Sequence, residues 1–242
     1  GEIMNEIVKI LNVCKTYSMG TQKKKFSKAE NDTTAKVHAL NGVSAAIEKG
    51  EFTAIAGPSG SGKTTLLNLI GALDSITSGD IFVDGTGLAG MNKKQKTLLR
   101  REKIGFIFQS YNLIPVLTAQ ENVELGLQLL NSFSKEEVKE KSWAILNEVG
   151  LNGMQDRLPS QLSGGQQQRI SIARALVKEP AVILADEPTA NLDSKNSAMI
   201  IELMKELNEK HSITCIFSTH DQFVMQNVRR IIRLKDGMLD NQ

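Results

Sequence analysis

Residues 57–64 have the types and spacing of a phosphate-binding loop. They satisfy the pattern G-x-x-x-x-G-K-S/T, after an apolar strand and before a helix-compatible run. Glycines leave backbone N–H groups free to surround a phosphate at a helix N-terminus, where the helix dipole favours negative charge. The alternative, a glycine-rich turn that binds nothing, does not explain this order of strand, turn and helix. The predicted phosphate site comprises Gly57, Pro58, Ser59, Gly60, Ser61, Gly62, the mobile cation Lys63, and Thr64 or Thr65 with a hydroxyl for Mg²⁺.

Two acids follow a second apolar run, residues 181–185. Asp186 ends this predicted strand and is expected to hold Mg²⁺ through water. Glu187 comes next, where a carboxylate beside the γ-phosphate can orient or deprotonate the attacking water. The alternative makes Asp186 a helix N-cap and Glu187 a solvated acid. The phosphate-binding loop upstream favours the interpretation as an Mg²⁺ ligand and a general base.

A second anion site is predicted where residues 162–166, Leu-Ser-Gly-Gly-Gln, open another helix. The side chain of Ser163 and the N–H groups of Gly164 and Gly165 form a helix start that suits a phosphate, with Gln166 in its first turn. Taken alone, Ser163 is equally explained as an N-cap. One chain therefore offers two predicted phosphate sites.

The elements that must position these residues point to an α/β protein. Residues 6–13, 37–47 and 52–56 are rich in β-branched residues and predict strands, with a polar, lysine-rich stretch at 20–36 that predicts a mobile loop. After Gly57 strands alternate with helices, which is typical of a parallel sheet covered by helices. Buried strands are expected at 81–83, 104–108, 181–185 and 213–217.

Capping-box patterns predict two helices between residues 118 and 150. Thr118 is followed three residues later by Glu121, and Ser134 by Glu137. Gly150 is expected to end the second helix. Trp143 is expected to pack on its apolar face. We predict that residues 111–162 form a helical lobe.

Composition limits the classes of protein to which this chain can belong. The 242 residues contain 29 Lys and Arg against 27 Asp and Glu, and this net charge of +2 gives no argument for a nucleic-acid partner. No apolar run approaches the roughly 18 residues of a membrane helix. Two cysteines supply neither a disulfide framework nor a zinc site, and no signal peptide is apparent. We expect a reduced, intracellular, soluble protein.

In their order along the chain, the motifs resemble those of an ATP-binding-cassette ATPase. The resemblance is carried by residues 57–64, Gln109, residues 162–166, 181–187 and 190–193, and His220. It implies that residues 1–242 form a single nucleotide-binding domain with ATP and Mg²⁺ as cofactors. The implied fold is a P-loop NTPase (RecA-like) parallel-sheet core with an N-terminal antiparallel β subdomain and a helical lobe.

Roles for four more side chains follow from this resemblance. Tyr17 resembles the aromatic that stacks on adenine, with a packed strand residue as the alternative. Gln109 resembles the glutamine that reaches Mg²⁺ and the attacking water, and His220 the histidine that donates to the γ-phosphate. Asp193 resembles the aspartate that links the two sites of a dimer, although it also suits an N-cap. The implied catalytic residues are Glu187, His220 and Gln109.

Residues 104–115 and 117–124 resemble more closely the subfamily that drives lipoprotein release, macrolide export and antimicrobial-peptide resistance. This implies a homodimeric motor on the cytoplasmic side of the membrane that serves a separate permease, with lipoprotein, peptide or drug-like cargo. DNA-repair ATPases carry long insertions that this chain lacks, and translation factors carry two P-loops. A P-loop kinase or GTPase would not explain residues 162–166. The stretch 20–36 is longer than the family pattern leads us to expect.

Overall fold

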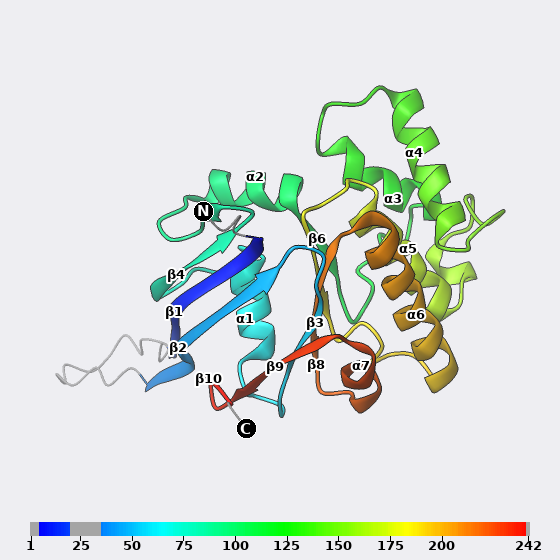
Figure 1. Ribbon diagram of the computed structural model, residues 1–242. Coiled ribbons are helices and arrows are strands. Elements are labelled where there is room, and N and C mark those ends of the chain that lie inside the picture. The colour runs from blue at the N-terminus through cyan, green and yellow to red at the C-terminus, as the bar shows by residue number, and fades with distance from the viewer. Residues whose placement is uncertain (1–4, 20–34, 241–242) are drawn as a thin grey trace, which may run out of the picture.

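The computed structural model describes residues 5–19 and 35–240, which build two β-sheets (Figure 1). The larger sheet has the order β10-β9-β3-β8-β7-β6, and only β10 in it runs antiparallel to its neighbour. Its strands are β3 (Phe52–Ala56), β6 (Ile104–Ile107), β7 (Val182–Asp186), β8 (Thr214–Thr219), β9 (Arg230–Lys235) and β10 (Met238–Leu239). Every residue of β3 and β8 is buried, as in a parallel sheet covered on both faces. The predicted parallel sheet is confirmed.

The smaller sheet is antiparallel and has the order β2-β1-β4-β5. It consists of β1 (Glu6–Met19), β2 (Ala35–Glu48), β4 (Ser78–Val83) and β5 (Thr86–Gly87). The prediction that residues 81–83 belong to the parallel sheet was wrong. Ile81 pairs with Ile10 and Val83 with Val8, so β4 closes the antiparallel sheet instead.

Helix α1 (Lys63–Ile70) lies between the two sheets and fills one of two hydrophobic cores (Figure 1). Leu66, Leu69 and Ile70 are fully buried there, and the same core takes in residues of β1, β2, β3 and β4. The helix therefore anchors the phosphate-binding loop at its N-terminus. Helix α2 (Lys93–Lys103), which we did not predict, lies at the edge of this half and begins with a capping box at Asn92.

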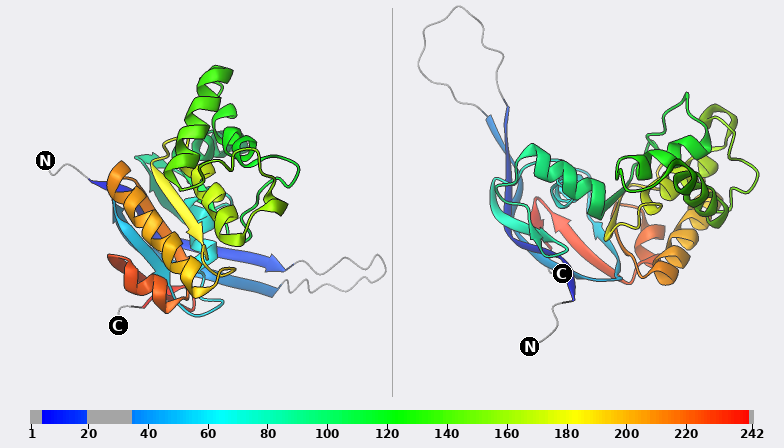
Figure 2. Two further views of the ribbon diagram at one scale, coloured as in Figure 1. Left: turned by 90° about the vertical axis from the view of Figure 1, so that its right-hand side faces the viewer. Right: turned by 90° about the horizontal axis from the view of Figure 1, so that it is seen from above.

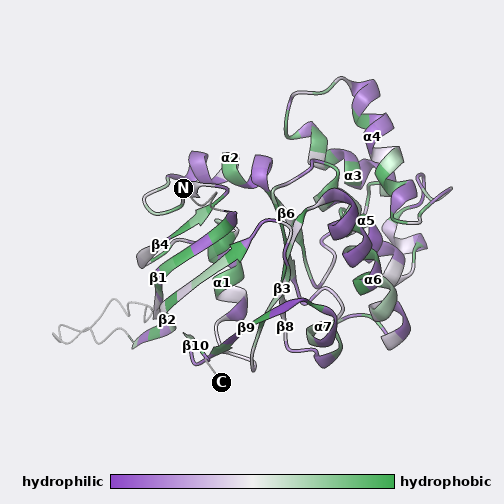
Figure 3. Cartoon of the chain, in the orientation of Figure 1, coloured by the Kyte–Doolittle hydropathy of each residue, from purple (hydrophilic) through white to green (hydrophobic). Residues whose placement is uncertain are grey.

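The second core lies on the other face of the six-stranded sheet. Helices α5 (Gly164–Leu176) and α6 (Ser194–His211) cover that face, and α7 (Gln222–Asn227) contacts α6. Helices α3 (Ala119–Gln128) and α4 (Lys135–Glu148) pack on each other and on α5, and the 3₁₀ turn η1 (Pro159–Gln161) precedes α5. Figure 2 shows α3 and α4 projecting beyond the sheet, and Figure 3 shows α2 and α4 mostly hydrophilic in contrast to α1.

The predicted capping boxes are confirmed. The hydroxyl of Thr118 accepts the N–H of Glu121 at 3.2 Å, and Ser134 accepts that of Glu137 at 3.2 Å. Gly150 has φ +76° and donates its N–H to Asn147 at 3.0 Å, as expected of a glycine that ends a helix.

The expected packing of Trp143 was wrong, because half of its surface is exposed. The buried residues of α4 are Val138, Ser142, Ile145 and Leu146. Ser142 belongs to the buried face of α4. Trp143 follows it in sequence and is therefore rotated about 100° around the helix axis, away from the middle of that face.

Most of the predicted loop at 20–36 lies outside the described residues, and residues 35 and 36 belong to β2. Among residues 5–19 and 35–240, no helix combines the length and the hydropathy that crossing a bilayer requires.

Candidate active site

The predicted residues meet at one edge of the six-stranded sheet because the carboxyl ends of four parallel strands lie side by side there. The phosphate-binding loop follows β3, Gln109 follows β6, Glu187 follows β7 and His220 follows β8. The strand ends are aligned by the pairs Ala56–Thr219, Asp186–Ser218 and Ile107–Ala185. This is the edge at which open parallel sheets bind their ligands.

The phosphate-binding loop depends on two of its glycines for its path. Gly62 is the N-cap of α1 with φ +100°, and a Cβ there would lie 2.6 Å from the carbonyl oxygen of Ala39. A Cβ on Gly57 would collide with the carbonyl oxygen of Leu234. The loop is thus fitted closely between β2 and the end of β9.

Lys63 is buried and folds back over this loop. Its ammonium donates to the carbonyl oxygens of Gly57 at 2.8 Å and Pro58 at 2.9 Å. The charge therefore already lies at the loop, held by neutral acceptors that charged phosphate oxygens can replace with a gain in strength.

The hydroxyl of Ser61 indicates that the loop is built for an anion. The residue is 2% exposed, and the hydroxyl has no hydrogen-bond partner among the described residues. A buried hydroxyl without a partner carries a desolvation cost of about 1–3 kcal/mol. With the N–H groups of the loop and Lys63 around it, this donor set fits the oxygens of a polyphosphate.

Thr64 and Asp186 meet where a metal ion on such phosphates would lie. The Thr64 hydroxyl donates to Asp186 Oδ1 at 3.2 Å, across 122 residues of sequence. Within residues 5–19 and 35–240, no three His, Cys, Asp or Glu side chains are grouped to hold a metal by themselves. The hydroxyl of Thr64 and the carboxylate of Asp186 are oxygen ligands of the kind that Mg²⁺ takes, and Mg²⁺ completes its octahedron with phosphates and water.

Glu187 is held in a strained conformation beside His220. Its φ of +44° is uncommon for a residue with a side chain, and its N–H donates to Ser218 at 2.9 Å. His220 Nδ1 lies 2.6 Å from Glu187 Oε1. The Glu187 side chain is 16% exposed and that of His220 is 68% exposed, so a mostly buried carboxylate faces an accessible imidazole.

The second predicted phosphate site is a helix start away from this loop. Ser163 caps α5, and its N–H donates to Gln166 Oε1 at 2.8 Å. Gln166 also reaches the sulfur of Met154 at 3.3 Å. Among the described residues, no hydrogen bond joins residues 163–166 to residues 57–64. Asp193 caps α6 by accepting the N–H of Asn196 at 2.8 Å, and this bond lowers its pKa.

The comparisons with known proteins agree with this geometry. The ABC transporter family model matches residues 40–190. An ABC transporter ATP-binding protein of Methanocaldococcus jannaschii, MJ0796, is 44% identical over 239 residues, which cover 98% of this chain and 96% of that protein. The chain belongs to the ABC transporter ATP-binding family. As an ABC ATPase it binds and hydrolyses ATP.

A solved dimer of MJ0796 in a post-hydrolysis state, bound to ADP and Pi, superposes on this ABC ATPase with a TM-score of 0.83 over 97% of each chain. The lipoprotein-releasing system ATP-binding protein LolD of Saccharophagus degradans is 41% identical and covers 98% of this chain and 97% of its own. The macrolide export protein MacB of Syntrophobacter fumaroxidans is 42% identical over 97% of this chain, which spans 31% of MacB. The likeness to this subfamily is confirmed.

Tyr17 lies near the end of β1 with 39% of its surface exposed. Its hydroxyl donates to Asp74 Oδ2 at 2.7 Å, and the ammonium of Lys15 lies 4.6 Å from its ring centroid. The side chain is therefore not a packed core residue of the strand. Its accessible ring suits the contact with adenine that the family resemblance implies, which remains a prediction.

Contacts around Gln109 were not foreseen from the sequence. Asn191 donates to the carbonyl oxygen of Gln109 at 2.9 Å. Arg174 of α5 donates to the carbonyl oxygens of Tyr111 at 2.8 Å and Asn112 at 2.6 Å, both of which have positive φ. The segment after Gln109 is thus fixed to the helix that Ser163 opens. No short sequence motif predicts these hydrogen bonds, because 62 residues separate Arg174 from Asn112.

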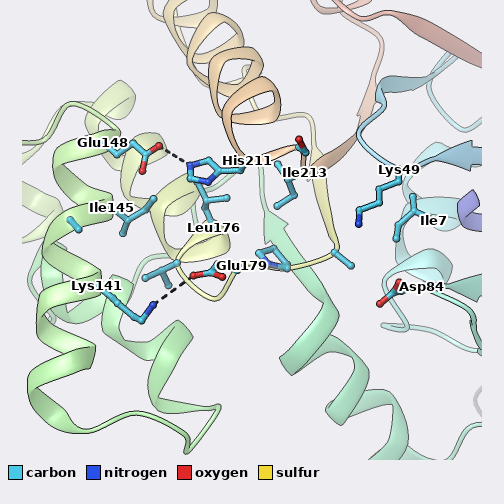
Figure 4. Close-up of a pocket in the computed structure, with 15 residues that line it drawn as sticks. Ile7, Lys49, Asp84, Lys141, Ile145, Glu148, Leu176, Glu179, His211 and Ile213 are labelled. Atoms are coloured by element: carbon cyan, nitrogen blue, oxygen red, sulfur yellow. Dashed lines mark hydrogen bonds and ion pairs between the residues drawn. The ribbon is translucent and has the colours of Figure 1, made fainter. Parts of the chain in front are cut away.

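A cavity of about 490 Å³ lies elsewhere, against the amino ends of β7 and β8 (Figure 4). Glu148 Oε1 lies 2.7 Å from both Lys210 Nζ and His211 Nε2 at its wall, and Lys141 faces Glu179 at 3.6 Å. Partial burial works to raise the pKa of Glu148, but the hydrogen bonds from Lys210 and His211 outweigh it and lower the pKa. These side chains neutralise one another, and the cavity contains none of the predicted ATP-site residues.

Proposed function

We propose that this ABC ATPase is the motor subunit of a membrane transporter and acts as a homodimer that encloses two MgATP. The observation that carries the proposal is the presence of two helix starts suited to phosphate, at Gly62 and at Ser163, with no hydrogen bond between them in the described chain. A composite site, in which one chain supplies the helix start at Gly62 and its partner supplies the one at Ser163, gives both helix starts a function. The dimeric structures of MJ0796, 44% identical to this chain, support it.

In this proposal residues 57–65 hold the phosphates and Tyr17 stacks on adenine. Thr64, Asp186 and Gln109 would hold Mg²⁺, which would supply positive charge to offset that of the phosphates. The partner chain's copies of residues 163–166 and Asp193 complete the site from the other side. The buried, unpartnered hydroxyl of Ser61 and the bond between Thr64 and Asp186 support this set of ligands.

Glu187 then acts as the general base for the attacking water. Its strained backbone and mostly buried carboxylate fix the position of this base. His220 contributes a donor to the γ-phosphate. A neutral His220 that gives its Nδ1 proton to Glu187 has only an acceptor left at Nε2, so it must turn away from Glu187 or be charged to donate. Its 68% exposed side chain has the freedom to turn.

The whole chain 1–242 is proposed to work as one nucleotide-binding unit with a helical lobe at 111–162, bound peripherally to a permease on the cytoplasmic side of the membrane. Ile114 and Val116, in the segment after Gln109, are 40% and 78% exposed and offer apolar contacts for such a permease. Likeness to LolD and MacB favours lipoprotein, peptide or drug-like cargo.

Glu187→Gln tests the chemical step. The amide keeps the shape of the side chain but cannot take a proton, so we expect MgATP binding to remain and hydrolysis to fall by about two orders of magnitude or more. Release of phosphate and ATP affinity by calorimetry measure the two effects. Glu209→Gln, at an exposed acid paired with Arg229, is the matched control and should hydrolyse ATP at the parental rate. Parental hydrolysis in Glu187→Gln would remove Glu187 from the mechanism.

A further inference from the structure

The hydroxyl of Tyr17 is engaged by a carboxylate that lies 57 residues away in sequence. It donates to Asp74 Oδ2 at 2.7 Å, while Lys15 donates to Asp74 Oδ1 at 2.7 Å. The two oxygens of Asp74 thus bind a ring hydroxyl and an ammonium at the same time. Because the Lys15 ammonium also lies over the Tyr17 ring, three side chains form one closed set of contacts.

The backbone that carries Asp74 is itself held firmly. Lys15 also donates to the carbonyl oxygen of Ser75 at 2.7 Å. From α2, Lys96 donates to the carbonyl oxygen of Asp74 at 3.0 Å and to the Ser75 hydroxyl at 2.7 Å. Arg100 donates to the carbonyl oxygen of Ala72 at 2.7 Å. Three cations therefore fix the short segment 72–75, and the carboxylate of Asp74 is presented to Tyr17 from a rigid base.

This segment directly follows α1, the helix whose first residue is Lys63. The phosphate-binding loop and Asp74 therefore lie at opposite ends of one short helix, whose apolar residues are buried. A tyrosine ring bound to Asp74 has a defined place relative to the phosphates, whereas a ring on a half-exposed strand has several rotamers available.

We propose that Asp74 and Lys15 are positioning residues that hold the Tyr17 ring in the orientation in which it stacks on adenine. The inference rests on the proposed adenine contact of Tyr17 and adds the groups that set its geometry. It predicts that the contacts of Asp74 contribute to binding of the base and not to binding of the phosphates.

The ionisation behaviour of the pair agrees with this geometry. Partial burial works to raise the pKa of Asp74, but the hydrogen bonds from Lys15 and Tyr17 outweigh it and hold the pKa below its usual value. Partial burial and the bond to Asp74 raise the pKa of Tyr17. Asp74 is thus a carboxylate and Tyr17 a neutral donor at pH 7.

The test compares binding of MgATP with binding of magnesium tripolyphosphate, which has no base. Tyr17→Ala is expected to weaken ATP binding most, and Tyr17→Phe and Asp74→Asn about threefold to tenfold, the worth of one hydrogen bond. All three should leave tripolyphosphate affinity unchanged. Asp84→Asn, at an acid bound to Lys103 at 2.7 Å, is the matched control and should leave both affinities unchanged.

The outcomes distinguish loss of the adenine contact from loss of the positioning role. If Tyr17→Ala leaves ATP affinity unchanged, the adenine contact itself is wrong. If Tyr17→Ala weakens ATP binding and both Tyr17→Phe and Asp74→Asn do not, the adenine contact stands and the positioning role is overturned. Equal losses for ATP and tripolyphosphate in Asp74→Asn would assign Asp74 to the structure of the phosphate-binding loop and would also overturn the proposal.

A spectroscopic readout checks the contact itself. The chain has two tyrosines, so Tyr17 is the only one in a Tyr111→Phe background. Its ionisation is followed by the absorbance of tyrosinate. Asp74→Asn removes the negative charge beside the hydroxyl, so the pKa of Tyr17 should fall relative to the same background with Asp74 intact. An unchanged titration would contradict the contact between the two side chains.

Discussion

Lys63 shows how a single side chain prepares the ATP site. Its ammonium donates to two carbonyl oxygens of the loop that it serves, and the side chain is buried. In the proposed site, bound phosphates would exchange these neutral acceptors for charged ones, which form hydrogen bonds about twice as strong. The ammonium already lies at the loop that is proposed to bind the phosphates.

Lys63→Ala is therefore expected to remove most MgATP binding, because it deletes the cation that is proposed to face the β- and γ-phosphates. Isothermal titration calorimetry measures the loss. Lys210→Ala, at an exposed lysine near the opposite edge of the sheet, should bind as the parent does. Unchanged affinity in Lys63→Ala would contradict the assignment of the phosphate site.

At the scale of elements, α5 connects the parts of the molecule that the sequence keeps apart. Ser163 opens it, Arg174 binds the backbone after Gln109, and Lys178, just beyond its end, donates to the carbonyl oxygen of Arg100 in α2 at 2.8 Å. Helix α5 therefore joins the segment after Gln109, its own start at Ser163 and α2 into one bonded unit.

The hydrogen bond from Lys178 to Arg100 requires burial of the ammonium, and the free-energy cost of this burial depends on pH. Desolvation by burial lowers the pKa of Lys178 from 10.5 to about 8. Below pH 8 both the folded and the unfolded chain carry the charge, and the folded chain bears the penalty of burying it. Between pH 8 and 10.5 Lys178 is more protonated in the unfolded chain than in the folded chain. The contribution of Lys178 to the free energy of unfolding therefore rises with pH in this range.

Lys178→Met should therefore stabilise the protein at pH 7 by about 1–2 kcal/mol, after allowance for the lost bond to Arg100. The gain should shrink by pH 10, where the folded parent has released its proton. Urea unfolding at the two pH values measures the free energies. Lys139→Met, at an exposed lysine of α4, provides the comparison and should show little change at either pH. A gain of equal size at pH 7 and pH 10 would contradict burial of the charge as its cause.

At the scale of the whole molecule, the proposed dimer requires each chain to supply only part of each ATP site. The phosphate-binding loop is anchored in the core between the two sheets, and the helix start at Ser163 belongs to the core on the other face of the larger sheet. Asp193 lies exposed at the N-terminus of α6. Exposed groups with this chemistry are what a second copy of the chain would use.

Single cysteines at the two helix starts test this arrangement. Cys14→Ser removes the accessible thiol, whereas Cys215 can remain because burial raises the pKa of its thiol to about 12. With Ser59→Cys and Ser163→Cys added, both at exposed positions, a disulfide requires Cα atoms within about 7 Å. We expect interchain bonds, a band of about twice 26.5 kDa on a non-reducing gel, enhanced by ATP in a Glu187→Gln background.

Bonds formed only within one chain would contradict the composite site. Light scattering of Glu187→Gln provides the second measurement and avoids any change at the helix starts. A mass that stays at 26.5 kDa with saturating MgATP would also contradict the dimer.

Features that depend on contacts of short range could be predicted from the residues alone. A capping box links residues only three positions apart, as at Thr118 and Ser134. A run such as residues 181–185 is apolar throughout because both faces of its strand are covered. The phosphate-binding loop belongs to the same class, since its glycines, lysine and threonine are contiguous. These patterns therefore predicted the parallel sheet, the helix starts and the family.

Contacts between distant segments became known from the packing of the folded chain. The sequence has no pattern that joins Tyr17 to Asp74 or Arg174 to Tyr111, because each side chain finds its partner through the packing of whole elements. The same holds for β4: its apolar residues fit either sheet, and pairing with β1 settles which one. Trp143 is exposed because the stripe that α4 buries is fixed by the neighbours α3 and α5, which the sequence of α4 does not contain.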